Sequence, residues 1–70
     1  MPKLRLGTFS DRELAVLRLV AEGHGNAEIG RLLGRAEDTV RHQLRRAMER
    51  TGSRNRAEVV VRAYLMGYVW

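Results

Sequence analysis

The 70-residue sequence has no cysteine, one proline and few aromatic residues. Without cysteine, neither a disulfide nor a thiolate zinc site can stabilise the fold, and the composition suits a reducing cytoplasm. The proline stands at position 2, so none interrupts a helix further along the chain. No stretch approaches the ~20 apolar residues of a membrane span, and no apolar signal segment follows Met1. We expect one small domain over residues 1–70, with its core at about 9–69 and no membrane partner.

Lysine is also scarce: Lys3 is the single lysine in the sequence, and the other twelve of the 13 cationic residues are arginines. These oppose eight acidic residues and give a net charge of +5. Arginine can bind phosphate as a bidentate fork and can recognise a base edge, whereas lysine acts mainly as a point charge. The arginine excess therefore favours a nucleic-acid partner, and a solvated basic surface is the simpler alternative.

Four helical segments can be predicted. The first begins in "FSDREL", where Ser10 and Glu13 are spaced as a capping box and Phe9 is placed for a hydrophobic staple with Leu14. Its apolar positions follow helical spacing: Leu14, Leu17, Val20 and Ala21. Gly23 predicts its end. The second segment is "NAEIGRLL", in which Ile29, Leu32 and Leu33 share one face.

The third segment is expected at about 37–50 and is ended by "TGS" at 51–53. Its apolar stripe consists of Val40, Leu44, Ala47 and Met48. The fourth opens at "NRAE", where Asn55 and Glu58 have the spacing of a second capping box, and it ends at Gly67. Its apolar positions are Ala57, Val60, Val61, Tyr64 and Leu65. These segments predict an all-α, four-helix (tetrahelical) domain.

The join between the second and third segments has the spacing of a helix-turn-helix. Gly30 stands where two crossing helices require a small residue, and Gly34 stands where the turn requires a positive φ. Apolar anchors flank the turn: Ile29, Leu33, Val40 and Leu44. The alternative is an ordinary helical hairpin with two glycines.

The exposed face of the third segment is cationic. Arg41 and Arg45 are one turn apart with His42 beside them, and Arg46 and Arg50 continue a flanking row. Acidic residues stand in the first turn, where the helix dipole favours them: Glu37 and Asp38. A major groove admits one such helix, and arginine is the commonest side chain to contact guanine. A solvated face with Glu–Arg pairs is the alternative.

Two long stretches resemble the LuxR/GerE/NarL-type DNA-binding domain of bacterial transcription regulators. "SDRELAVLRLVAEGHGNAEIGRLL" is similar to the first two helices of that family. "TVRHQLRRAMERTGSRNRAEVVVRAYLMGYV" is similar to its recognition helix, the break after it and its fourth helix. The resemblance runs from about Phe9 to Val69, which is nearly the whole chain.

The resemblance implies sequence-specific binding of double-stranded DNA, with the third helix in the major groove. Base contacts then fall on Arg41, His42 and Arg45. Phosphate contacts are expected from the start of the second helix and from cations around the third: Arg12, Asn26, Ala27, Arg35, Arg46 and Arg50. It also implies a homodimer on DNA through the fourth helix, at Val59, Val60, Ala63 and Tyr64. A bacterial, cytoplasmic, nucleoid-associated protein follows, without a cofactor or bound small molecule.

The sequence departs from the family pattern in several places. Gly25-Asn26-Ala27 replaces the usual Ser-Asn-Lys, and Ala36 replaces the Ser that caps the third helix. Loss of a capping hydroxyl to alanine costs about 1 kcal/mol. Arg35 replaces an apolar residue beside that helix start and could supply a lost phosphate contact. The middle of the third helix has Gln43 where histidine is common, and Thr51-Gly52-Ser53 replaces a Leu-Gly-Val-type break.

Two other functions compete with a sequence-specific regulator. One is a protein-interaction module that kept the fold and lost DNA binding, which the missing caps and Asp38 favour. The other is a sigma-factor region-4-like domain, which the fourth helix disfavours because such domains typically end at the recognition helix. No catalytic constellation indicates an enzyme, and His24 and His42 lack the converging ligands that a metal needs.

Two further expectations concern packing. Glu13 is expected to pair with a distant arginine, for which Arg56 is the candidate. The apolar C-terminal end either closes the core or forms a contact surface: Tyr64, Leu65, Met66, Tyr68, Val69 and Trp70.

Overall fold

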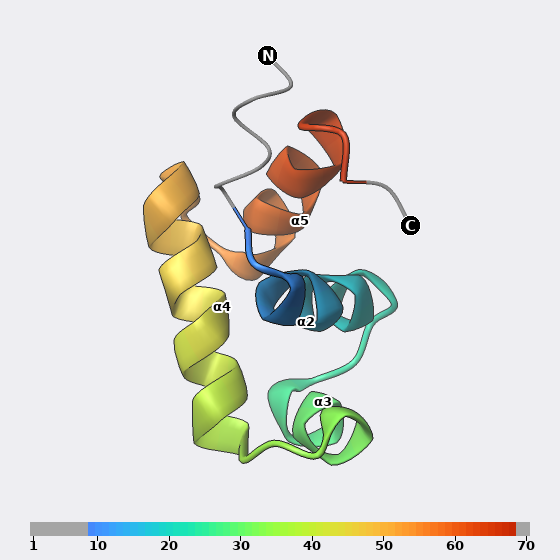
Figure 1. Cartoon of the computed structure of the whole chain (residues 1–70). Helices are drawn as coiled ribbons and strands as arrows, with labels where there is room; N and C mark the ends of the chain where they lie inside the picture. Colours follow the sequence, from blue (N-terminus) through green and yellow to red (C-terminus); the bar gives the residue numbers. More distant parts are fainter. Residues whose placement is uncertain (1–8, 69–70) are drawn as a thin grey trace.

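The computed structural model describes residues 9–68, which form four helices joined by short loops and contain no strand (Figure 1). The helices are α2 (Asp11–Ala21), α3 (Asn26–Leu33), α4 (Glu37–Thr51) and α5 (Arg56–Leu65). The expected all-α, four-helix class is confirmed. The expectations for residues 1–8, and for Val69 and Trp70, lie outside the described residues.

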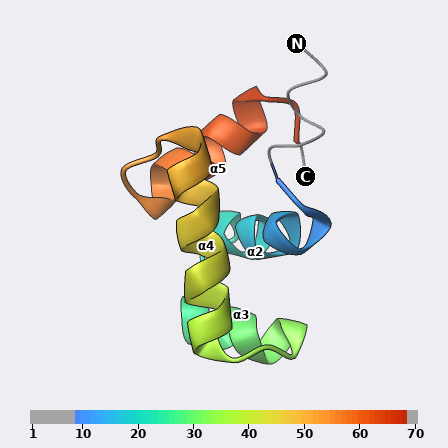
Figure 2. The same cartoon turned by 60° about the vertical axis from the view of Figure 1, so that its left-hand side comes forward.

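The longest helix, α4, lies along one side of the molecule, and α3 packs near its N-terminal end (Figures 1 and 2). The other end of α4 lies beside α5, and α2 lies between these two levels. Because all three other helices pack on the same side of α4, its opposite side is left exposed along the whole helix.

Capping side chains begin α2 and α5. The Ser10 hydroxyl accepts a hydrogen bond from the Glu13 amide, and the Ser10 amide donates to the Glu13 carboxylate, both at 3.1 Å. The predicted capping box of α2 is therefore confirmed. At α5, Asn55 Oδ1 accepts from the Glu58 amide at 2.8 Å, but the Glu58 carboxylate accepts from the amide of Arg54 at 2.6 Å. The predicted second capping box is therefore wrong in one of its two hydrogen bonds, because the Glu58 carboxylate binds the amide of Arg54 instead of the amide of Asn55.

The turn between α3 and α4 has the predicted helix-turn-helix geometry. Gly34 ends α3 in the left-handed region, with φ of 70°. Gly30 lies so close to the next segment that a Cβ atom there would be 2.5 Å from the Arg35 carbonyl oxygen. The Arg35 amide also donates to the Gly30 carbonyl at 2.8 Å. Position 30 therefore requires a residue without a side chain because the backbone of Arg35 lies so close to it.

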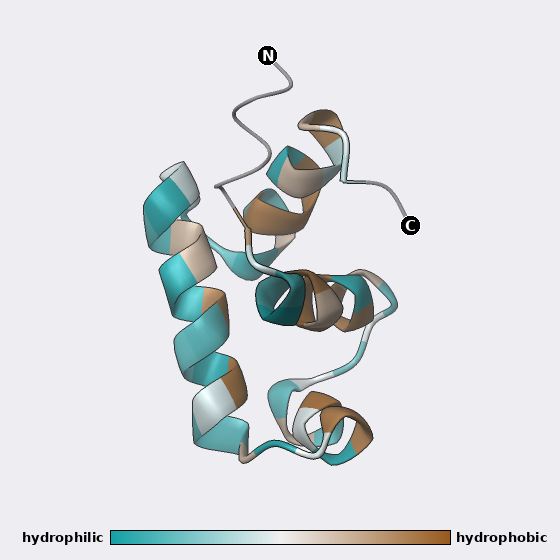
Figure 3. Cartoon of the chain, in the orientation of Figure 1, coloured by the Kyte–Doolittle hydropathy of each residue, from teal (hydrophilic) through white to brown (hydrophobic). Residues whose placement is uncertain are grey.

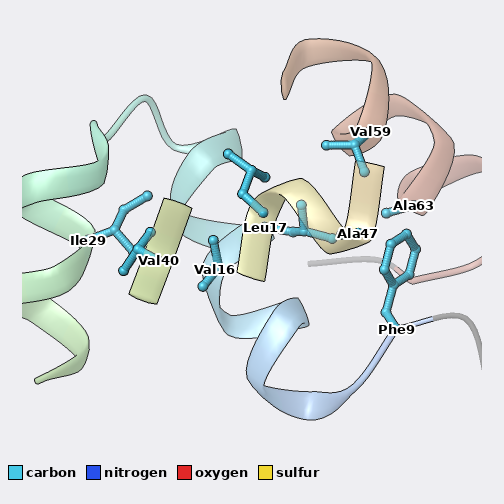
Figure 4. Close-up of a cluster of buried hydrophobic side chains, with 9 residues drawn as sticks. Phe9, Val16, Leu17, Ile29, Val40, Ala47, Val59 and Ala63 are labelled. Atoms are coloured by element: carbon cyan, nitrogen blue, oxygen red, sulfur yellow. The ribbon is translucent and has the colours of Figure 1, made fainter. Parts of the chain in front are cut away.

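All four helices contribute to a single core (Figure 4). Its fully or nearly fully buried hydrophobic side chains are Phe9, Val16, Leu17, Ile29, Val40, Leu44, Ala47, Val59 and Ala63. Each of the larger aliphatic side chains contributes about 1.5–3 kcal/mol through burial. The stripe predicted for α4 is confirmed, since Val40, Leu44 and Ala47 are buried and Met48 packs against them.

The predicted apolar faces of α3 and α5 need correction. Leu32 is 56% exposed, so it does not share the buried face of Ile29. On α5 the core is formed by Val59 and Ala63, whereas most of the positions expected to face it are exposed: Ala57, Val61, Tyr64 and Leu65. The helix carries apolar residues nearly all round, so helical spacing alone did not identify the buried side.

The C-terminal aromatic residues divide between the two roles considered for them. Tyr68 packs edge-on against Phe9, with ring centroids 5.1 Å apart. Tyr64 and Leu65 instead remain 60% and 75% exposed. Met66 also packs against the core, so the same end of the chain closes the core with Met66 and Tyr68 and leaves Tyr64 and Leu65 as an apolar surface.

Candidate nucleic-acid interface

The exposed side of α4 is hydrophilic over its length (Figure 3). Arg41, His42 and Arg45, the predicted base-contacting residues, are all exposed on it. This follows from helix geometry, since Val40, Leu44 and Ala47 turn the opposite side into the core. The sequence thus correctly predicted that these three side chains lie together at the surface.

The three side chains differ in their local partners. Arg41 donates to the Glu37 carboxylate at 3.3 Å and also pairs with Asp38. Among residues 9–68, neither His42 nor Arg45 has a hydrogen-bonding or ion-pairing partner. Surface ion pairs of this kind are worth about 0–1 kcal/mol, so Arg41 can exchange its acids for another ligand at little cost.

A groove of 540 Å³ lies between the start of α2 and one flank of α4. Three expected phosphate-binding arginines line it, together with His42: Arg12, Arg46 and Arg50. The rest of the lining is mostly polar and includes Thr39 and Gln43. Arg12 and Arg46 are exposed, so their guanidinium groups can reach a ligand outside the groove.

Arg50 has a structural partner that the sequence did not reveal. Its guanidinium pairs with Glu13, whose side chain is 9% exposed, and this contact joins the end of α4 to the start of α2. The predicted pair of Glu13 with Arg56 is therefore wrong. The Glu13 carboxylate both accepts from the Ser10 amide and binds Arg50, so one buried acid caps α2 and holds α4.

Arg35 also binds within the chain. Its guanidinium donates to Gln43 Oε1 at 2.9 Å and to the carbonyl of Arg12 at 3.2 Å. Partial burial, together with the charge of Arg12, lowers the pKa of Arg35. Arginine nevertheless stays protonated at neutral pH. The side chain therefore connects the helix-turn-helix turn to α2 and to the middle of α4.

The start of α3 contains the two remaining predicted phosphate contacts, Asn26 and Ala27. Ala27 is exposed, and Asn26 is half-buried. Arg56 donates to Asn26 Oδ1 and to the His24 carbonyl, both at 3.1 Å. Nearby, His24 Nδ1 lies 2.8 Å from Glu28, and this hydrogen bond raises the pKa of His24 and lowers that of Glu28.

Two residues expected at a dimer contact cannot supply one. Val59 and Ala63 have no exposed surface in the single chain, because both face the core. Val60 is half-buried and Tyr64 is exposed. Val61 and Leu65 are exposed beside Tyr64, at one-turn spacing on the outer side of α5.

Within residues 9–68, none of the helices is long and apolar enough to span a bilayer. In the same part of the chain, no three His, Asp or Glu side chains are grouped so that they could hold a metal ion.

A helix-turn-helix whose second helix exposes a cationic face is the architecture of a DNA-binding domain. Comparison with known protein families agrees, since residues 7–63 match the family described as bacterial regulatory proteins, luxR family. The chain belongs to this family and is a LuxR-type DNA-binding domain of transcription regulators. This family of transcription-factor domains is non-enzymatic.

Two curated proteins illustrate the relationship. The transcriptional activator protein PhzR of Pseudomonas fluorescens is 39% identical over 61 residues, which cover 87% of this chain and 25% of that protein. The transcriptional activator protein AnoR of Acinetobacter nosocomialis is 34% identical over 59 residues, covering 84% and 25%. The chain thus spans about a quarter of the length of these relatives. No solved structure matches it.

Proposed function

We propose that the chain binds DNA sequence-specifically, with α4 in the major groove and Arg41, His42 and Arg45 at base edges. The observation that carries this proposal is the shared exposure of these side chains on the side of α4 that α2, α3 and α5 leave uncovered. His42 and Arg45, without partners among residues 9–68, are available to a ligand directly. Arg41 requires release from Glu37 and Asp38.

Phosphate contacts are proposed at two places beside this helix. Arg12 and Arg46 are exposed at the groove between α2 and α4, and Asn26 and Ala27 begin α3. Arg35 and Arg50, expected from the sequence as phosphate contacts, already bind groups within the chain. We assign these two arginines to holding α4 in place.

A homodimer on DNA through α5 is proposed on a different surface from the one expected. Three of the exposed large hydrophobic side chains lie on this helix: Val61, Tyr64 and Leu65. Aromatic and apolar side chains are typical of interface cores. We therefore retain Tyr64, together with the half-buried Val60, and replace Val59 and Ala63 by Val61 and Leu65. As a regulator of transcription, the protein is proposed to act in the bacterial cytoplasm at the nucleoid.

The proposal can be tested by selecting binding sites from a pool of random duplex DNA. Replacing Arg45 with alanine should cost about 1–3 kcal/mol on the selected duplex and relax the preference at one position. Replacing Arg46 with alanine should weaken binding to all DNA sequences by a similar factor. It should also reduce the slope of log affinity against log salt concentration by about one. Arg62→Ala is the matched control, since Arg62 is on α5 and pairs only with Glu58 among residues 9–68.

The rival functions give different outcomes. A protein-interaction module that has lost DNA binding shows no salt-sensitive affinity for any duplex, and that result would refute the proposal. A sigma-like promoter domain remains disfavoured, because α5 follows the proposed recognition helix and contributes to its core.

A further inference from the structure

Arg56, the first residue of α5, contacts the loop and helix start that precede the helix-turn-helix turn. Its guanidinium donates one hydrogen bond to Asn26 Oδ1 and another to the His24 carbonyl oxygen, each at 3.1 Å. Arg56 is half-buried and lines a shallow pocket together with Val20, Ala57 and Val60. A contact across 30 residues thus joins the proposed dimer helix to the start of α3.

The chemistry of this contact fixes the orientation of the Asn26 amide. Arginine has only donors, so the atom of Asn26 that faces it must be the oxygen. The Nδ2 group, which carries both amide hydrogens, therefore points away from Arg56. A phosphate oxygen accepts hydrogen bonds, so Nδ2 is the end of the amide that a phosphate requires.

The electrostatics also favour an anion beside this contact. Both acceptors of Arg56 are uncharged, and within residues 9–68 no acidic side chain forms an ion pair with it. The acids nearest to it are already engaged: Glu58 on the same helix pairs with Arg54 and Arg62. Glu22 and Glu28, which flank Asn26 in the sequence, both pair with His24. The charge of Arg56 is therefore not neutralised by a local carboxylate.

We propose that Arg56 is a positioning residue for DNA binding, which holds Asn26 Oδ1 so that Nδ2 is presented to a backbone phosphate. The inference rests on the proposed phosphate contact at the start of α3. It adds a residue from α5 that does not itself touch DNA. It also connects the packing of α5 to the DNA-binding side of the domain.

A double-mutant cycle on the full chain tests this role, with a short duplex of random sequence as the probe. Asn26→Ala should lower affinity about tenfold, since a hydrogen bond to a charged phosphate is lost. Arg56→Met should lower it by a similar factor, and the double variant should bind no more weakly than the weaker single variant. Neither change should alter the salt slope, because no cation leaves a phosphate.

Two further variants separate positioning from charge. Arg56→Lys keeps the charge but loses the planar fork, so affinity should stay below that of the parent chain. Asn26→Asp keeps an oxygen for Arg56 and a stable fold, but it replaces the donor with a negative charge. DNA affinity should then fall by more than tenfold while the melting temperature is maintained. If Arg56→Met does not fold, this variant still decides whether position 26 presents a donor.

Several results would overturn the inference. A salt slope reduced by about one in Arg56→Met, with losses that add to those of Asn26→Ala, makes Arg56 a direct phosphate contact. Full affinity in Arg56→Met, in Arg56→Lys or in Asn26→Asp removes the positioning role. The proposed function is judged separately by Arg45→Ala, because loss of base preference there does not depend on position 26 or 56.

Discussion

Replacing Gly30 with alanine should destabilise the helix-turn-helix, because the added methyl group meets the backbone of the next segment. The new Cβ atom would lie 2.5 Å from the Arg35 carbonyl oxygen. Ordinary C···O contacts are about 3.3 Å or longer, so the two backbones must separate by about 0.8 Å. The Arg35 residue cannot retreat freely, because its amide donates to the Gly30 carbonyl at 2.8 Å.

Three contributions set the size of the effect. Overpacking of this kind costs about 1–3 kcal/mol, and weakening the hydrogen bond between Arg35 and Gly30 adds about 1 kcal/mol. Alanine returns about 1 kcal/mol, because it is a better helix former than glycine. The net loss in the free energy of unfolding is therefore about 1–3 kcal/mol. In a domain of this size, each kcal/mol lowers the melting temperature by about 4–8 °C.

Thermal unfolding followed by far-UV circular dichroism measures this change. Gly25→Ala is the matched control, because no atom lies within 4 Å of the added Cβ and the backbone φ is an ordinary −85°. Alanine is a poorer N-cap residue than glycine, so the free energy of unfolding of this control should fall by no more than about 1 kcal/mol. If Gly30→Ala melts within about 2 °C of the parent chain, or higher, the argument that position 30 requires glycine for this contact is refuted.

Three further predictions concern the helix starts, the dimer surface and pH. Ala36→Ser should raise the melting temperature by about 4–8 °C without changing the selected DNA sequence, and an unchanged melting curve would mean that α4 begins elsewhere. Leu65→Asp should abolish the two-chain complex on the selected duplex, whereas Leu32→Asp, also at an exposed leucine, should leave it intact; equal effects would contradict a dimer through α5. Glu28→Gln should lower the pKa of His24 in a titration of its ring-proton chemical shifts, because the Glu28 hydrogen bond is what chiefly raises it. This pair stabilises the fold only while His24 is protonated and Glu28 is ionised. Its contribution is therefore lost as pH rises through the raised His24 pKa, and also as pH falls through the lowered Glu28 pKa. An unchanged titration midpoint of His24 in Glu28→Gln would contradict the contact.

Local features of the fold could be predicted from the sequence because they depend on neighbouring residues. The Ser10 capping box, the left-handed Gly34 and the small residue at position 30 each follow from backbone requirements within a few residues. The same is true of the α4 face, where a polar majority leaves one narrow apolar stripe. The exposed positions of Arg41 and Arg45 follow directly from that stripe.

The long-range contacts could not be predicted in the same way. Which arginine meets Glu13 depends on where the end of α4 lies against α2, and periodicity does not contain that information. On α5, valines at three successive positions leave the buried side undetermined until the other helices are placed. The Arg56 contact with Asn26 likewise requires the relative placement of α3 and α5.

The four helix starts differ in a way that affects local dynamics. α2 and α5 begin with capping side chains, whereas α3 and α4 begin at Gly25 and Ala36, where no side chain accepts from the first-turn amides. Those first-turn amide hydrogens should exchange with solvent deuterium faster than the equivalent ones in α2 and α5. Among the helix starts within residues 9–68, the two without a capping side chain thus belong to the helices of the helix-turn-helix. An anion at either start would slow exchange there and stabilise the helix end by replacing the missing cap.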